Sequence, residues 1–147
     1  MLSQRSRYAL KALLYLADVG EGWSAISTIS EATSISRKFL EGILLELKRY
    51  RLVDSVRGKF GGYRLARPAT EITFGDVIRA TDGPIALVPC ASKNFYRPCD
   101  DCLDETTCAL HKVMARARAK MGEVLDSTSL AEIAADRESL KGAGLRL

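Results

Sequence analysis

A three-residue turn between two short amphipathic segments constrains the fold of this chain more than any other feature. Segment 27–33 has the apolar spacing of a short helix, with Ser27 as its expected N-cap. The turn covers 33–35, and Ser36 is the expected cap of a further helix over 37–49. Two short helices joined in this way are typical of a helix-turn-helix, although an ordinary helical hairpin has the same pattern.

The segment 37–49 is amphipathic. Its apolar residues recur at helical spacing on one face, namely Phe39, Leu40, Ile43, Leu44 and Leu47. The residues that point away from this face are Arg37, Lys38, Glu41 and Leu45. In a helix-turn-helix the second helix enters the major groove of DNA, so we expect this segment to be a recognition helix.

A glycine-rich hairpin directly follows. Residues 52–56 and 63–65 have the composition of two strands, and the connection between them contains three glycines. Arg57 and Lys59 lie at the expected tip, where an Arg suits the negative potential of a narrow DNA minor groove. Ordinary solvent-exposed hairpins also contain such turns. The order helix, turn, helix, hairpin is more specific than either part, and it predicts a winged helix-turn-helix.

Charge is distributed unevenly along the chain. Residues 1–67 contain twelve Lys and Arg and six Asp and Glu, whereas residues 68–147 contain ten and twelve. A basic N-terminal half indicates a polyanionic partner, although a solvated basic surface has the same composition. No apolar stretch is long enough to span a membrane and no secretory signal is evident, so we expect a cytoplasmic protein without a membrane partner.

Further segments are predicted to be helical. Residues 5–19 are apolar nearly all round and form the expected first helix. Thr73 caps another helix, with Asp76 completing a capping box. A long helix is expected over about 107–126, and a short one begins near Ser129. The predicted fold class is therefore mainly α with a small β-hairpin wing (α+β).

The long helix carries an apolar stripe with alternating spacings of four and three residues. The stripe consists of Leu110, Met114, Ala117, Met121 and Val124. This is the a/d pattern of helices that pair with one another, although such a stripe can also pack on its own domain. We favour a homodimer, because helix-turn-helix proteins usually read two DNA half-sites.

All four cysteines and the single histidine lie between positions 90 and 111: Cys90, Cys99, Cys102, Cys108 and His111. Thiols are reduced in the cytosol, so metal or redox chemistry is favoured over a disulfide framework. Neighbouring acids raise thiol pKa values, and a bound cation reverses that effect; they are Asp100, Asp101, Asp104 and Glu105. Iron–sulfur clusters and structural zinc both use thiolates, and the spacing Cys99-x2-Cys102 permits a zinc chelate.

The histidine is a less specific signal than the thiols. Cys108 and His111 are three residues apart at the start of the long helix, so they face the same side. A histidine at this position is also an ordinary helix-surface residue.

Together these motifs resemble the Rrf2 family of bacterial winged-helix regulators, whose members include IscR, NsrR, RirA and CymR. The resemblance runs from position 7 to about position 133, and its most specific stretches are 35–41, 52–58, 61–63 and 71–83. It implies homodimeric repressors or activators whose recognition helix and wing grip an operator in double-stranded DNA. It also implies a long helix that crosses onto the partner subunit.

Site residues follow from the resemblance by position. It places Ser36, Arg37, Lys38 and Glu41 in the base-reading part of the recognition helix, and Arg57 and Gly58 at the wing beside Lys59. In cluster-binding members three cysteines hold a 2Fe–2S or 4Fe–4S cluster, and these match Cys90, Cys102 and Cys108. His111 matches the position that supplies a histidine ligand in some members.

Two features depart from the family pattern. The loop between Cys90 and Cys102 is longer than in the best-known members, and Cys99 is an additional thiol, so the fourth ligand can be Cys99 rather than His111. Some relatives take an acid from the partner's first helix, but no acid precedes Asp18 in this chain.

We therefore expect a winged helix-turn-helix DNA-binding domain over 1–83 and a cysteine-rich cluster-binding loop over 84–108. A dimerisation helix with a short terminal helix is expected over 109–135, and a flexible tail over 136–147. The expected function is a homodimeric transcriptional regulator in which an iron–sulfur cluster controls DNA affinity or specificity in response to iron, redox or nitric oxide status.

The alternative is a regulator of the same fold with structural zinc, or with thiols that sense oxidants or persulfides directly. An enzyme is not expected, because the sequence has no phosphate loop, nucleotide fingerprint or Ser/His/Asp set.

Overall fold

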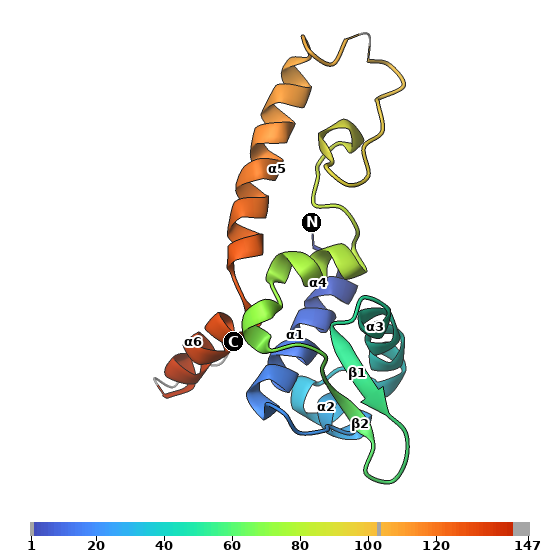
Figure 1. Ribbon diagram of the computed structural model, residues 1–147, viewed down its shortest axis with the longest axis vertical. Coiled ribbons are helices and arrows are strands. Elements are labelled where there is room, and N and C mark those ends of the chain that lie inside the picture. Colours follow the sequence, from blue (N-terminus) through green and yellow to red (C-terminus); the bar gives the residue numbers. More distant parts are fainter. Residues whose placement is uncertain (1, 103, 143–147) are drawn as a thin grey trace.

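Helices make up most of the chain. The computed structural model describes residues 2–102 and 104–142. Its elements are α1 (Gln4–Val19), α2 (Ile26–Thr33), α3 (Arg37–Arg49), β1 (Val53–Val56), β2 (Gly62–Leu65), a 3-10 turn (Ala69–Glu71), α4 (Phe74–Thr81), a second 3-10 turn (Pro89–Ala91), α5 (Ala109–Ser127) and α6 (Leu130–Gly142). Figure 1 separates two regions: a winged region formed by α1–α4, the hairpin and α6, and an arm formed by loop 84–108 and α5.

Helix α1 is the centre of the winged region. Ser3 caps it by accepting a hydrogen bond from the backbone N–H of Ser6, and Gly20 ends it with a positive φ (75°), which glycine adopts readily. Leu13 and Leu16 are fully buried, and α1 contacts α2, α3, α4 and α6. The first helix expected over 5–19 is therefore confirmed, and it supplies the surface on which the other helices pack.

The helix-turn-helix expectation is confirmed, with one correction at its start. Helix α2 begins at Ile26, and its N-cap is Ala25 rather than Ser27. The reason is that the chain is already held in an extended conformation at Ala25, whose carbonyl accepts the first helical hydrogen bond from Ile29 at 3.1 Å. Ser34 adopts the left-handed conformation (φ 56°) that the turn requires.

Helix α3 has the predicted bounds, and the hydroxyl of its N-cap Ser36 accepts from the N–H of Phe39 at 3.5 Å. Leu40, Ile43, Leu44 and Leu47 are buried, whereas Phe39 is 56% exposed. Phe39 was wrongly included in the apolar face, because it lies roughly 90° around the helix from the centre of the four buried side chains. Its ring instead meets Tyr8 edge to face, with 6.0 Å between centroids.

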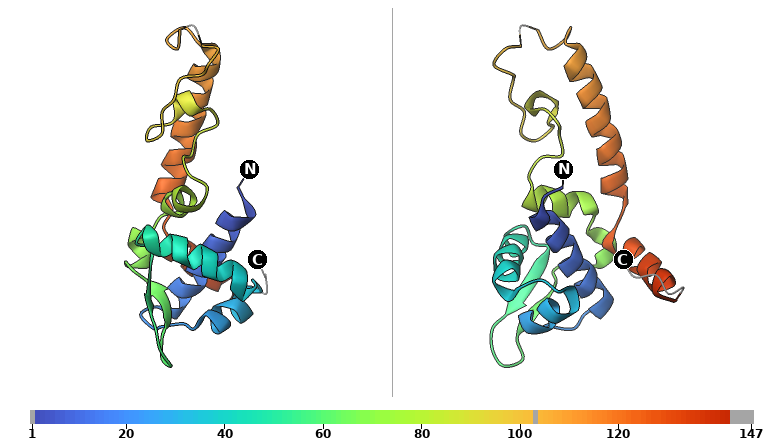
Figure 2. Two further views of the ribbon diagram at one scale, coloured as in Figure 1. Left: turned by 90° about the vertical axis from the view of Figure 1, so that its right-hand side faces the viewer. Right: turned by 180° about the vertical axis from the view of Figure 1, so that it is seen from behind.

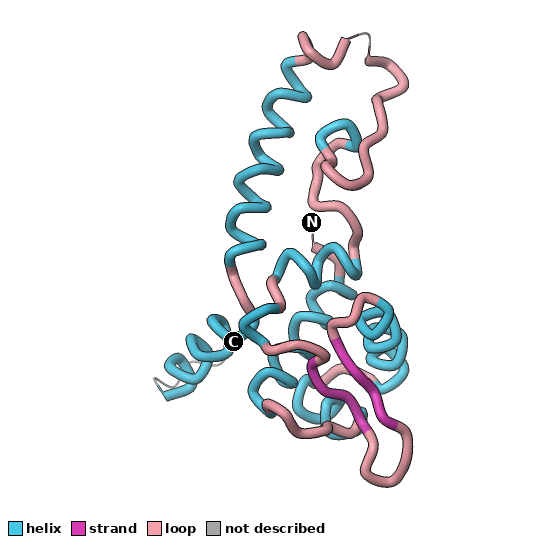
Figure 3. The backbone as a smooth tube through the Cα atoms, in the orientation of Figure 1, coloured by secondary structure: helices cyan, strands magenta, loops and turns pink. Residues whose placement is uncertain are grey.

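The wing is a two-stranded antiparallel hairpin in which Val53 pairs with Leu65 and Val56 with Gly62. The tube in Figure 3 shows the two strands running from the helices out to a rounded tip. Backbone hydrogen bonds of 2.9 and 2.8 Å between Ser24 and Tyr63 add a bridge from the α1–α2 connection to β2. A side chain at Gly62 would collide with the carbonyl of Ser24, so this close approach requires glycine.

The arm is joined to the winged region at both ends, through α4 before the loop and through residues 128–129 into α6 after α5. The predicted capping box of Thr73 and Asp76 is present, and a bridge between Thr73 and Ser129 places the start of α6 beside α4. Helix α6 adds Leu130 to the core and continues to Gly142, past position 135 where the ordered part was expected to end. Residues 143–147 of the expected tail lie outside the described residues.

The arm leaves the winged region as an extended structure in both views of Figure 2. Helix α5 begins at Ala109, two residues later than expected, because Cys108 is its N-cap. The turn Pro89–Ala91 contacts α5, so the loop lies alongside the helix. Within the described ranges, none of the helices is both long and apolar enough to cross a membrane.

Candidate functional site

The exposed face of α3 carries the predicted base-reading residues. Ser36, Arg37, Lys38 and Glu41 are all exposed near the N-terminal end of the helix. The opposite face is fixed on α1 by buried leucines, so this polar face is turned outward. The helix dipole places partial positive charge at this end, which adds to that of Arg37 and Lys38. The arrangement suits contact with a polyanion.

Arg5 of α1 joins this surface, and we did not identify it from the sequence. Its guanidinium lies 2.7 Å from the carboxylate of Glu46, which ties α1 to α3. Arg5 and Lys38 also line a recess of about 440 Å³ whose other walls are Phe39, Gly42 and Ile43. A basic residue at the start of the first helix was visible in the sequence, but its position beside α3 depends on helix packing.

The wing tip presents Arg57, Gly58 and Lys59, all of which are exposed. Gly58 has a φ of 118°, which only glycine adopts readily, so the tight tip depends on it. The neighbouring Phe60 is 87% exposed, and the ammonium of Lys59 lies 5.7 Å from its ring centre. Figure 1 shows the tip projecting beyond the helices, at the end of the hairpin that points away from α4. Cations on a narrow projection can reach into a groove that a helix cannot enter.

The base of the wing is held to the helices. Lys48 of α3 donates a hydrogen bond of 2.7 Å to the hydroxyl of Ser55 in β1. Arg64 of β2 lies over the ring of Trp23 at 4.4 Å. These contacts fix the direction of the hairpin relative to α3, so the two exposed basic surfaces keep a constant spacing.

Two of the four free thiols lie close together in the arm. The sulfur of Cys99 lies 3.7 Å from that of Cys90, which is buried in the turn Pro89–Ala91. Cys108 caps α5, and its sulfur accepts from the N–H of His111 at 3.4 Å. Cys102 lies between these groups along the chain, and its backbone N–H donates to the carbonyl of Cys99 at 3.2 Å.

The thiols influence one another. The hydrogen bond with Cys90, followed by burial, raises the pKa of Cys99, and Asp101 adds a smaller effect. Burial and then the neighbouring Cys108 and Cys99 raise the pKa of Cys102. The acids of the loop were expected to raise these pKa values, but the other thiols and burial have larger effects than Asp101 on Cys99. Protonated thiols are therefore favoured until a cation arrives.

His111 belongs to a chain of three polar side chains. Its Nδ1 lies 3.1 Å from one carboxylate oxygen of Glu105, close enough for an ion pair but not aligned as a hydrogen bond, and the hydroxyl of Tyr96 donates to the other oxygen at 2.5 Å. A carboxylate beside Nδ1 favours the tautomer with a proton on that nitrogen, which leaves Nε2 as the possible metal ligand. Neither Tyr96 nor Glu105 was predicted, since a loop sequence gives no periodic signal for such contacts.

The thiols and the imidazole fit a thiolate-bound metal or cluster, although the loop does not bring them close enough to bind one together. Thiols and an imidazole are the ligands that zinc and iron–sulfur clusters take. Within 2–102 and 104–142, no group of three His, Cys, Asp or Glu side chains converges at metal-binding distances. Binding through three or four of these donors therefore requires the loop to draw together.

In the part of the chain that the structure describes, the apolar stripe of α5 is not buried: Met114, Ala117 and Met121 are partly exposed and its two ends are exposed. Leu110 is 57% exposed and Val124 is 63% exposed, and none of the nineteen residues of α5, all of them described, is buried. An exposed apolar stripe of this length on a soluble helix is typical of a pairing surface.

Comparison with known proteins gives a consistent result. The model of the Rrf2 family, described as an iron-dependent transcriptional regulator, matches residues 2–136. An rrf2-like HTH-type transcriptional regulator of Rhodobacter capsulatus is 40% identical over 139 residues, covering 92% of this chain and 93% of the relative. Among solved structures, the global cysteine regulator CymR of B. subtilis is similar with a TM-score of 0.74 and 33% identity, covering 92% of this chain and 96% of that one. IscR of T. potens is similar with a TM-score of 0.74 and 29% identity, covering 100% and 93%.

Proposed function

Because the chain belongs to the Rrf2 family of transcriptional regulators, we propose that it is a homodimer whose binding to operator DNA is controlled by an iron–sulfur cluster. The observation that carries this proposal is the position of the thiols. They lie in the single connection between α4, which belongs to the winged region, and α5, which carries the apolar stripe. A change in the loop therefore alters the geometry between these two helices.

As a family of transcriptional regulators, these proteins are not enzymes.

In the proposed complex, two recognition helices enter successive major grooves. Ser36, Arg37, Lys38 and Glu41 lie in the part of the helix that reads the base edges. Arg57 reaches the adjacent minor groove, with Gly58 and Lys59 at the same tip. If the basic set makes six or more phosphate contacts, affinity falls about 10³-fold or more between 50 and 200 mM salt. A flat salt response would argue against DNA as the partner. Since the operator lies on the chromosome, we place the protein in the cytoplasm.

For the cluster we propose Cys90, Cys102 and Cys108 as ligands and His111 as the fourth. The Tyr96–Glu105 pair supports His111, because its carboxylate lies 3.1 Å from Nδ1 and leaves Nε2 for a metal. Cys99 is the alternative fourth ligand, since its sulfur already lies 3.7 Å from that of Cys90. When bound, the cluster supplies a redox-active centre that iron supply and nitric oxide can remove. Cys108 is the N-cap of α5, so a cluster bound to its sulfur would fix the start of that helix.

The restraint can reach the winged region through two contacts. Arg79 of α4 and Asp126 of α5 form a two-point ion pair with distances of 2.7 and 2.8 Å. A side chain at Gly75 would collide with that carboxylate, so α4 and α5 also approach closely here. When α5 is fixed, one orientation of α4 has a lower free energy than the other. A shift between two DNA-binding geometries requires such a difference in free energy.

Anaerobic purification tests the cofactor. We expect a brown protein with visible absorbance, about two to four iron atoms and equal sulfide per protomer. A colourless protein with stoichiometric zinc would overturn the cluster and favour the structural-zinc alternative. Separate Cys99→Ser and His111→Ala variants then identify the fourth ligand by which of them loses iron.

A second candidate function is direct thiol sensing, and the Cys90–Cys99 pair favours it. A peroxide can oxidise the two thiols to a disulfide, with loss of two protons and two electrons to the oxidant, which is reduced to water. We expect this pair to form an intramolecular disulfide in metal-free protein, detectable by mass spectrometry after alkylation. A metal-free protein whose operator affinity does not change on oxidation would exclude this function.

A further inference from the structure

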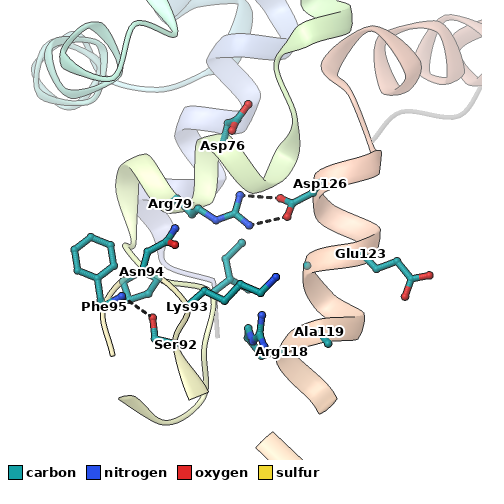
Figure 4. A pocket seen from close by; sticks show the side chains of 13 residues that line it. Asp76, Arg79, Ser92, Lys93, Asn94, Phe95, Arg118, Ala119, Glu123 and Asp126 are labelled. Carbon is teal, nitrogen blue, oxygen red and sulfur yellow. Dashed lines mark hydrogen bonds and ion pairs between the residues drawn. The ribbon is translucent and has the colours of Figure 1, made fainter. Parts of the chain in front are cut away.

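A second cavity lies at the junction of the arm and the winged region, away from the sulfur atoms. It has a volume of about 740 Å³ and is bounded by α4, by the residues that follow the turn Pro89–Ala91, and by the second half of α5. Figure 4 shows Arg79 and Asp126 at one end of this slot, with Lys93 and Arg118 pointing toward its middle. None of the four cysteines lines it.

The acids that line the slot already have cationic partners. Asp126 is paired with Arg79 at 2.7 Å, and the carboxylate of Glu123 lies 2.7 Å from Lys120. Asp76 completes the α4 capping box and lies 3.4 Å from Arg67, a weaker pair. The negative charges of the slot are therefore largely compensated by existing contacts.

Two cations of the slot are not compensated in this way. In the part of the chain that the structure describes, neither Lys93 nor Arg118 forms an ion pair. The charge of Lys93 contributes to the lowered pKa of Asp126. The Nε of Arg118 is inaccessible to solvent and has no hydrogen-bond partner. An unsatisfied buried donor on a charged side chain is costly, so the protein does not fully compensate this guanidinium.

The slot stays open when α5 pairs with another helix. The slot residues of α5 include Arg118, Ala119, Gly122 and Asp126. At about 3.6 residues per turn, they are centred roughly 135° around the helix from the stripe of Leu110 to Val124. A partner helix on the stripe therefore leaves this side free.

From these observations we propose that the slot binds a small organic anion. Its carboxylate or phosphate group lies between Arg118 and Lys93, and Asn94 offers an additional hydrogen-bond donor. Ile85 and Phe95 supply apolar surface for the rest of the molecule. Because the slot contacts both α4 and α5, the occupant bridges the same junction as the Arg79–Asp126 pair. The slot is thus a second effector site of the regulator, separate from the thiols.

Calorimetric titration of the full chain tests the site, with inorganic phosphate in one arm and succinate in the other. Sodium chloride at matched ionic strength serves as the reference. We expect one anion per protomer, and the arm with the tighter binding identifies phosphate or carboxylate as the preferred group. Arg118→Met and Lys93→Gln are expected to weaken binding about 10- to 100-fold, because each removes a charge-assisted hydrogen bond. Arg116→Met removes an exposed charge from the same helix outside the slot, and it should bind as the unsubstituted protein does.

A stability measurement separates loss of the site from loss of folding. Arg118→Met removes the unsatisfied buried donor, so its Tm without anion should rise by about 2–4 °C while anion binding is lost. Binding no tighter than chloride in both arms would overturn the proposal. The proposal would also be overturned if three variants bound the anion with equal affinity, namely Arg118→Met, Lys93→Gln and Arg116→Met. That result would show binding of an adventitious ion only.

Discussion

The winged region and the arm differ in how they are stabilised. In the winged region, leucines and isoleucines from α1, α2, α3 and α6 enclose one another, and α4 closes the core. In the arm, no residue of α5 is buried, although the helix is the longest in the described chain. The winged region is therefore stabilised by a core of its own, whereas α5 leaves its apolar side chains exposed or partly exposed, and we propose that a partner subunit covers them.

Polar groups give a weaker contrast. The Arg5–Glu46 and Lys48–Ser55 contacts fix elements of the winged region to one another, yet Glu46 and Arg67 in that region each have a buried polar atom without a hydrogen-bond partner. The arm has such an atom at the Nε of Arg118, and it also carries four free thiols. We propose that signals act on the protein through these groups of the arm.

Truncation of a core residue and of a stripe residue gives the largest expected contrast. Leu44→Ala should lower the free energy of unfolding by about 3 kcal/mol, since Leu44 is fully buried and its removal leaves a cavity. Leu110→Ala should have little effect on the protomer but should raise the dimer dissociation constant. Denaturant unfolding at two protein concentrations measures both, because only a dimer interface makes stability depend on concentration. Equal and concentration-independent losses would remove the distinction between the regions.

Glu105→Gln tests the arm on its own. The substitution keeps the shape of the side chain but weakens its hold on Nδ1 of His111, and loss of such an orienting carboxylate typically lowers metal affinity about 10- to 100-fold. Iron retention against a chelator measures the change, and Tyr96→Phe should give a smaller change in the same direction. The matched control is Glu123→Gln, which lies on α5 away from the thiols. Iron loss that is equal in the control would contradict the role of Glu105.

Arg57→Ala tests the winged region in the same way. Removing this side chain should lower operator affinity about tenfold without a change in Tm, because Arg57 is exposed at the wing tip. Lys112→Ala on α5 is a suitable control, since it removes one positive charge far from the hairpin. Fluorescence anisotropy with labelled operator DNA measures the affinities. An unchanged affinity for Arg57→Ala would remove the wing from the interface.

The smallest expected effect concerns the ion pair at the junction. The hydrogen bond from Arg79 lowers the pKa of Asp126 below its ordinary value, even though burial acts in the opposite direction. A lowered pKa in the folded state stabilises the protein above about pH 4, and this stabilisation is lost as the pH falls through the folded-state value. Because the pair is partly exposed, Asp126→Asn should cost at most about 1 kcal/mol at pH 7. The difference from the unsubstituted protein should shrink toward pH 3 in unfolding curves, and a constant difference would exclude the pair as its cause.

Local signals in the sequence were sufficient for most of the winged region. The bounds of α3, the capping box of Thr73 and the glycine-rich wing were predicted, because each depends on a few neighbouring residues. Prediction was wrong where packing decides: Ser27 does not cap α2, and Phe39 contacts Tyr8 instead of entering the core. Both residues lie at the margin of a periodic pattern, where either assignment satisfies the pattern.

The arm was less predictable, for a physical reason. The spacing of the thiols indicated their chemistry, but it gave no information on the short distance between Cys90 and Cys99 or on the contact of Glu105 with His111. These arrangements depend on the course of an irregular loop. The slot combines Arg79, Lys93 and Arg118 from three separate elements, so only the folded chain brings its cations together.

We propose that the state of the loop sets the affinity of the winged region for DNA. The most direct measurement is the operator affinity of anaerobically reconstituted protein and of metal-free protein, at equal concentration and salt. We predict affinities that differ at least tenfold, and a Cys108→Ser variant that gives the metal-free value under both conditions. Equal affinities for the two forms, with full iron occupancy in the reconstituted sample, would contradict the claim.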